Sequence, residues 1–153
     1  MTYEVDFSGM HLNMIYALEK IELPDDYDPY TLDGYAGNKA LRKLVKKILL
    51  RIINADSKDS VLASVKKDKD AKEVDLPGEI GTFDRLLELI EEKHKVVSEK
   101  YFYKDQGKHL QYHDAELANK IMMSYAGRGE AILPVHDSFI VVNEGITKLK
   151  DIM

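Results

Sequence analysis

The segment ILPVHDSFIVV, residues 132–142, places two apolar runs on either side of three polar residues. Short runs of β-branched and aromatic residues predict strands, and so short a break predicts that the two strands pair as an antiparallel hairpin. Tight hairpin turns normally use Asn-Gly or Asp-Gly, because they require positive φ angles. His-Asp-Ser does not fit that pattern, which indicates that something other than turn chemistry selects His136 and Asp137.

A further strand is predicted at the start of the chain. The stretch TYEVDF alternates and is rich in strand formers, so we expect a short strand ending at Asp6, then a turn and an amphipathic helix over 10–21. If this strand lies beside the hairpin, the carboxylates of Asp6 and Asp137 converge. Two carboxylates a few ångströms apart stay ionised only with a cation between them, and hard oxygen ligands suit Mg²⁺.

The rest of the chain predicts helices and loops. The expected elements are a loop over 22–38, a helix over 39–55 capped by Asn38, a polar lysine-rich segment over 57–81 that is helical only in its first third, a helix from the cap Thr82 to about Tyr103, and a helix from the cap Asp114 to Gly127. Together these elements predict one α+β domain over 1–153, with a small antiparallel sheet covered by helices on one side.

The helix over 39–55 has a cationic face formed by Lys39, Arg42, Lys43, Lys46 and Lys47. Like charges one turn apart cost a few tenths of a kcal/mol, and a bound polyphosphate would reverse that penalty. Residues 39–72 hold eleven basic and four acidic residues, against eleven and twenty-three elsewhere, within a net charge of −5. A solvated basic surface explains this pattern equally well.

Composition excludes several classes of protein. The 153 residues include no cysteine, which excludes disulfides and thiolate metal sites. No apolar run approaches the ~20 residues of a membrane span. The first residues lack a basic stretch followed by an apolar one, so we expect a cytoplasmic protein with no membrane partner.

The order of these features resembles the palm and fingers of family A DNA polymerases and of phage-type single-subunit RNA polymerases. VDFSGMHLNMIYA is similar to their motif A, RKLVKKILLRIINA to motif B, and LPVHDSF to motif C, in the His-Asp-Ser version of the RNA polymerases. LQYHDAELANKIMM resembles the helix that precedes motif C.

The resemblance implies a template-directed nucleotidyltransferase with a palm-like fold, in which 38–80 form a finger-like basic helix and loop insertion. It implies two Mg²⁺ ions, a nucleoside triphosphate, and a primed or templated nucleic acid as partners. The implied residues are Asp6 and Asp137 for catalysis, Asp6, Phe7 and Asp137 for metal, Arg42, Lys46, His11 and Asn54 for the nucleotide, and Gln111 and His136 for the nucleic acid.

The chain also departs from the family pattern. Asn54-Ala55 replaces a Tyr-Gly pair, and His11 stands where the DNA polymerases have a glutamate. Motif A begins five residues from the first residue given, which leaves nothing for a thumb. Three explanations stay open: a truncated chain, one part of a split enzyme whose thumb comes from another chain, or a reduced relative. A catalytically idle nucleic-acid-binding or assembly fragment is one alternative, and a Mg²⁺-dependent nuclease or phosphoesterase is another.

Simpler roles also remain open for single residues. Asp6 suits a helix cap, Asp137 a turn residue, and His136 a satisfied polar core residue. His109 and His113 have a spacing that can chelate Zn²⁺ on a helix, but no HExxH pattern accompanies them, which favours structural or exposed histidines.

Overall fold

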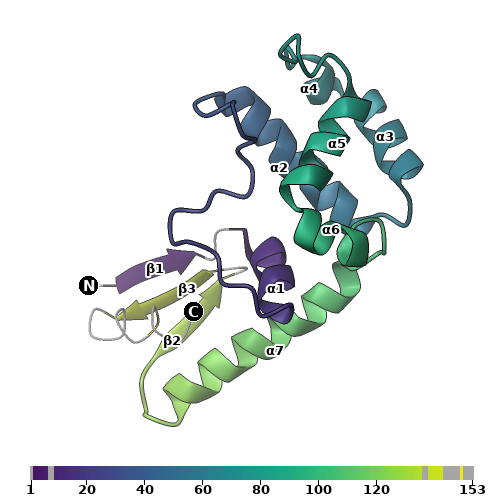
Figure 1. Cartoon of the computed structure of the whole chain (residues 1–153). Coiled ribbons are helices and arrows are strands. Elements are labelled where there is room, and N and C mark those ends of the chain that lie inside the picture. Colours follow the sequence, from purple (N-terminus) through teal and green to yellow (C-terminus); the bar gives the residue numbers. More distant parts are fainter. Residues whose placement is uncertain (1, 7–8, 136–137, 143–148, 150–153) are drawn as a thin grey trace. The chain divides into compact units, whose positions relative to one another are not determined.

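The computed structural model describes residues 2–6, 9–135, 138–142 and 149, and for Asp6 the backbone only. Within those residues it has seven helices and a three-stranded antiparallel sheet (Figure 1). The predicted α+β class is therefore confirmed.

The sheet joins the two ends of the described chain. Its strands are β1 (Thr2–Asp6), β2 (Ile132–Val135) and β3 (Ser138–Val142), in the order β1-β3-β2. Both pairs are antiparallel, and the N-terminal strand lies beside the hairpin, as predicted. It pairs with the second strand of that hairpin.

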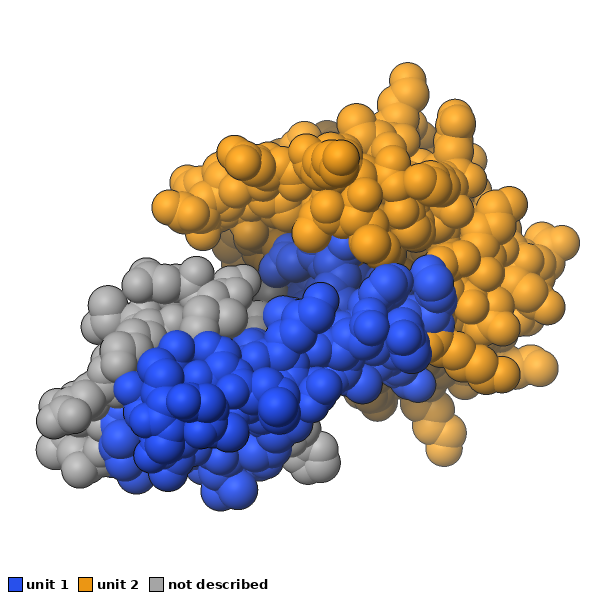
Figure 2. Space-filling model, turned by 90° about the horizontal axis from the view of Figure 1, so that it is seen from below, with its two compact units in different colours: residues 1–14, 109–153 blue, residues 15–108 orange. Residues whose placement is uncertain are grey.

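The chain divides into two compact units (Figure 2). Unit 1 comprises residues 1–14 and 109–153, and unit 2 comprises residues 15–108. The boundaries fall within helix α1 (Met10–Leu18) and near the start of helix α7 (Gly107–Ala126). The second unit is thus wider than the insertion over 38–80 that the sequence suggests.

Unit 1 is built by α7 packing against the sheet (Figure 1). Because side chains alternate across a strand, every second residue of β1 and β3 contributes to one apolar face. The buried cluster contains Ile121, Tyr125, Phe139, Val141 and Leu149, with Val5, Leu117, Ala118, Met122 and Ile132 packed around it. This cluster fixes the sheet, and hence the strand ends that carry the predicted carboxylates.

Unit 2 is helical. Its helices are α2 (Lys39–Asn54), α3 (Lys58–Lys67), α4 (Lys69–Lys72), α5 (Phe83–Lys93) and α6 (Lys95–Tyr101). The predicted caps of α2 and α5 are confirmed: Asn38 Oδ1 accepts from the Leu41 amide at 3.0 Å, and Thr82 Oγ1 accepts from the Arg85 amide at 3.2 Å. None of the described helices is long and apolar enough to cross a membrane.

The prediction of one helix from Thr82 to Tyr103 is wrong, because the helix breaks at His94. The His94 side chain is fully buried, with Nε2 3.1 Å from the Pro29 carbonyl oxygen and Nδ1 2.8 Å from the Tyr16 hydroxyl. Because a carbonyl oxygen only accepts, Nε2 carries the proton and the Tyr16 hydroxyl donates to Nδ1. Both ring nitrogens are thereby satisfied inside the protein.

The segment 103–106 caps the C-terminus of α2. The amides of Tyr103, Gln106 and Asp105 donate to the carbonyls of Ile52, Ile53 and Ala55 at 3.1, 2.9 and 2.9 Å. Helix α7 then begins at Gly107, so the predicted start at Asp114 is wrong. These contacts satisfy carbonyls that a helix leaves without partners at its C-terminal end.

Candidate functional site

The ends of β1 and β3 form the first part of the candidate site. In the register of this pair Asp6 lies opposite Ser138, and Val5 lies opposite Phe139. Asp137 is the residue that precedes Ser138 in the chain. The side chain of Asp6, and the predicted site residues Phe7, His136 and Asp137, lie outside the described residues.

A third carboxylate, which the sequence interpretation missed, lies in the same strand pair. The buried Ser138 hydroxyl is 2.6 Å from Glu4 Oε1 and 2.9 Å from the Val135 carbonyl oxygen, and it can donate to either. Glu4 and Asp6 are two residues apart on β1, a spacing that puts residues on one face of a strand. The alternation of side chains along the strand could therefore have identified Glu4 from the sequence.

Arg42 on α2 has an internal partner. Its Nε donates to Asp28 Oδ2 at 2.6 Å and its second terminal nitrogen donates to Oδ1 at 3.0 Å, a bidentate pair. Asp28 also accepts from the Tyr30 amide at 3.2 Å and from the Thr31 hydroxyl at 2.5 Å. The guanidinium of Arg42 is the main reason that the pKa of Asp28 is lowered to about 2. Arg42 therefore anchors the loop before α2.

Lys46 lies one turn further along α2 and shares an aromatic partner with Arg42. The Arg42 guanidinium carbon and Lys46 Nζ lie 5.4 and 5.5 Å from the centre of the buried Tyr30 ring. Within the described residues, Lys46 pairs with no carboxylate. Lys46 is thus better placed than Arg42 to bind an external phosphate, because its ammonium group is exposed and Arg42 is paired with Asp28.

Other charges of the basic helix are neutralised within unit 2. Lys47 Nζ lies 2.7 Å from Asp70 Oδ2, and Arg51 pairs with Asp68. Asp68 caps α4 by accepting from the Ala71 amide at 3.3 Å. Part of the excess of basic residues over 39–72 therefore forms ion pairs that join α2 to the segment around α4.

Asn54 lies at the last turn of α2. Its Nδ2 donates to the Leu50 carbonyl oxygen at 2.6 Å, and a Cβ added to Gly107 would lie 1.8 Å from its Oδ1. The Asn54 side chain and the backbone at Gly107 are therefore in close contact. The position matched to the family's Tyr-Gly pair thus belongs to the junction between α2 and the start of α7.

The remaining predicted residues are on helices. His11 is half-buried on α1, and Gln111 is exposed on α7. With Asp6 they belong to unit 1, whereas Arg42, Lys46 and Asn54 belong to unit 2.

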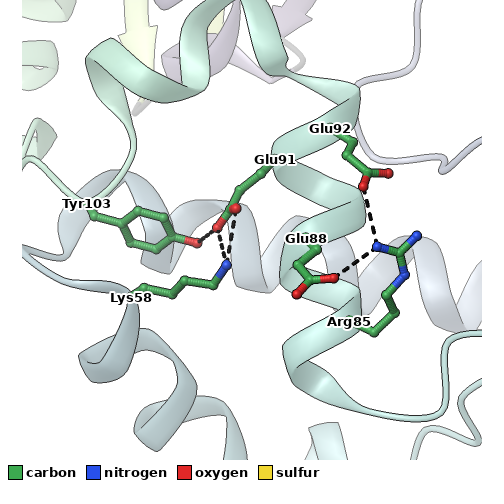
Figure 3. A network of polar contacts seen from close by, with 6 residues as sticks. All are labelled: Lys58, Arg85, Glu88, Glu91, Glu92 and Tyr103. Carbon is green, nitrogen blue, oxygen red and sulfur yellow. Dashed lines mark hydrogen bonds and ion pairs between the residues drawn. The ribbon is translucent and has the colours of Figure 1, made fainter.

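A polar network in unit 2 was also missed. Glu91 on α5 accepts from the Tyr103 hydroxyl at 2.7 Å and pairs with Lys58 Nζ at 2.8 Å, beside an Arg85 that bonds Glu88 and Glu92 (Figure 3). Burial, and then the bond to Glu91, raise the pKa of Tyr103 far above its usual range. The network ties α3, α5 and the segment that caps α2, which favours a structural role.

Across the described residues, no group of three or more His, Asp or Glu side chains is arranged to hold a metal ion. The pair that the sequence predicts, Asp6 and Asp137, falls outside that search because neither carboxylate is described. Its donor chemistry, two aspartates at adjacent strand ends, fits Mg²⁺.

No family model matches this chain, and no curated protein or solved structure is significantly similar to it.

Proposed function

We propose that the protein is a palm-like nucleotidyltransferase that extends a nucleic acid on a template. The observation that supports the proposal is the register of β1 with β3, which sets Asp6 opposite Ser138. Residues opposite one another in an antiparallel pair have Cα atoms about 4.5–5.5 Å apart, and chain neighbours about 3.8 Å apart. The Cα atom of the residue that precedes Ser138 therefore lies within about 9 Å of the Cα atom of Asp6, a separation at which two aspartate carboxylates can reach shared metal ions.

In this proposal Asp6 and Asp137, with the backbone at Phe7, would hold two Mg²⁺ ions. The bound ions would favour ionisation of a 3′-hydroxyl and stabilise the leaving pyrophosphate. The 3′-oxygen forms a bond to the α-phosphorus while the bond from that phosphorus to the β-phosphate bridging oxygen breaks. The hydroxyl proton passes to water, and pyrophosphate leaves.

The other proposed site residues bind the nucleotide and the nucleic acid. Lys46 neutralises the triphosphate, because its exposed ammonium group pairs with no described carboxylate. Arg42 can bind the triphosphate as well only if its guanidinium group leaves Asp28 and pairs with a phosphate. The resemblance assigns His11 and Asn54 to the nucleotide, and Gln111 and His136 to the nucleic acid.

Incorporation of labelled nucleotides on a primed template tests the proposal. We expect activity that needs Mg²⁺ and falls by on the order of 10²-fold or more in Asp6→Asn and Asp137→Asn. Asp26→Asn is the matched control, because Asp26 is an exposed aspartate in the loop before α2. Equal activity in Asp137→Asn and in the control would contradict the proposal.

A second candidate is a catalytically idle fragment that binds nucleic acid or assembles with a polymerase-like partner. The bidentate Arg42–Asp28 pair favours it, because that pair occupies a cation that the resemblance assigns to triphosphate. It predicts salt-dependent binding of labelled nucleic acid with no incorporation, and binding that is unchanged in Asp137→Asn. Incorporation that Asp137→Asn abolishes would exclude it.

A further inference from the structure

Two histidines lie one turn apart near the start of α7. His109 is exposed, and the side chain of His113 is 31% exposed. Their Nε2 atoms are 3.4 Å apart, and the two ring centres are 4.7 Å apart with the rings nearly perpendicular. Both residues belong to unit 1, so the pair depends on one continuous helix only.

The separation of the two nitrogens matches one edge of a metal coordination tetrahedron. A Zn–N bond of about 2.05 Å and a tetrahedral angle place two ligand nitrogens about 3.3 Å apart. An ion can therefore bind both Nε2 atoms with little movement of either ring. We propose that His109 and His113 form a bidentate site for a divalent transition-metal ion such as Zn²⁺, with water at the other positions.

The surroundings of His113 support this arrangement. Glu116 Oε2 lies 3.7 Å from His113 Nδ1, and Glu116 Oε1 accepts from the Tyr112 hydroxyl at 3.1 Å. A carboxylate beside the far nitrogen of a histidine favours the tautomer with the proton on Nδ1, which leaves Nε2 unprotonated for the metal. The 3.7 Å separation is longer than a hydrogen bond, so Glu116 accepts from Nδ1–H of a metal-bound His113 after a small side-chain movement.

The other described histidines lack these properties. His94 is buried with both ring nitrogens bonded inside the protein. His11 has no histidine one turn away on α1. Imidazole nitrogens select Zn²⁺ over Mg²⁺, so this site is chemically distinct from the carboxylates of the proposed function and does not depend on that proposal.

Calorimetric titration of the full chain with Zn²⁺ in a non-chelating buffer tests the inference. We expect one site per chain, an affinity at least about tenfold weaker in His109→Gln or His113→Gln, and no such site in the double variant. Glu116→Gln should weaken binding less than loss of either ligand. His11→Gln is the matched control and should bind like the wild type.

Nuclear magnetic resonance of the histidine ring nitrogens gives an independent readout. Zn²⁺ should shift the Nε2 resonances of His109 and His113, whereas excess Mg²⁺ should leave them unchanged. Circular dichroism should show that the variants keep their helix content. Zn²⁺ binding of equal strength in the wild type and in the double variant, or Nε2 resonances that do not respond to excess Zn²⁺, would overturn the inference.

Discussion

Asp28 and Arg42 form a bidentate pair, with nitrogen–oxygen distances of 2.6 and 3.0 Å, that joins the loop before α2 to the cationic face of that helix. Arg42 is 45% exposed at its side chain, so phosphate can compete with Asp28 for it. The pair therefore sets how much positive charge α2 presents to a ligand.

Removing the carboxylate at position 28 should release that charge. In Asp28→Asn we expect a nucleoside triphosphate to bind more tightly, by a factor of a few, because hydrogen bonds to charged groups contribute about 1.5–3 kcal/mol and screening at this exposed site reduces that gain. Titration calorimetry with Mg²⁺ and nucleotide measures the change. Asp33→Asn, at a side chain that is 99% exposed, is the control. Weaker binding in Asp28→Asn would show that the pair organises the site instead of blocking it.

His94 makes stability depend on pH. Burial is the main reason that its pKa is lowered to about 4, so the unfolded chain, with a pKa near 6.5, binds more protons between those values. The free energy of unfolding should therefore be highest above pH 6.5 and fall by about 3 kcal/mol as the pH drops to 4, because each pKa unit corresponds to 1.36 kcal/mol.

Urea unfolding at several pH values measures this slope. His94→Gln should reduce the slope between pH 6.5 and 4, and resonance titration of the His94 ring in the wild type measures its pKa directly even if the variant does not fold. A ring that titrates near 6.5 in the folded protein would contradict the buried, neutral state.

A side chain added at Gly107 would meet the Asn54 side chain in its present position. Alanine normally favours a helix over glycine by up to about 1 kcal/mol, but here its Cβ would lie 1.8 Å from Asn54 Oδ1. Because the Asn54 side chain is exposed and can rotate, we expect Gly107→Ala to break the bond from Asn54 Nδ2 to the Leu50 carbonyl and to cost about 1 kcal/mol. Asn54→Ala in the same chain should restore most of that loss, and thermal unfolding of the two single variants and the double variant measures the coupling. Additive effects would show that the two residues do not meet.

The α7–sheet cluster should dominate the stability of unit 1. Ile121 is fully buried in that cluster, so Ile121→Ala should cost about 2–5 kcal/mol. Lys120→Ala, at the exposed neighbouring position, should change the free energy of unfolding by less than about 0.5 kcal/mol. Denaturant unfolding measures the change in the free energy of unfolding for both variants. Equal changes would show that Ile121 is not part of the buried cluster.

Local signals predicted much of the fold. Asn38 and Thr82 act as helix caps because their side chains bond backbone amides only three residues away. The apolar runs of 132–142 and the alternation of TYEVDF predicted the strands and their pairing. The period of two that identifies Asp6 also marks Glu4, and this second carboxylate could have been found.

Long-range contacts decided what the sequence interpretation missed. The helix breaks at His94, whose ring bonds Tyr16 and Pro29, 78 and 65 residues away, and no local pattern reveals such partners. The segment before Gly107 caps α2, which sets the start of α7. Arg42 and Lys46 were assigned to the nucleotide from the resemblance to motif B. The partner of Arg42, Asp28, lies in a loop with several aspartates, and the sequence does not show which of them pairs with Arg42.

The central claim is that Asp6 and Asp137 share divalent ions at the end of β1 and β3. Mn²⁺ substitutes for Mg²⁺ at carboxylate sites and broadens the amide resonances near it. We expect titration with Mn²⁺ to broaden the amides of Val5, Asp6 and Ser138 first, and we expect Asp137→Asn to abolish that effect while Asp26→Asn preserves it. Broadening that begins away from these strand ends and outside the His109–His113 pair, or the same broadening in Asp137→Asn, would contradict the claim.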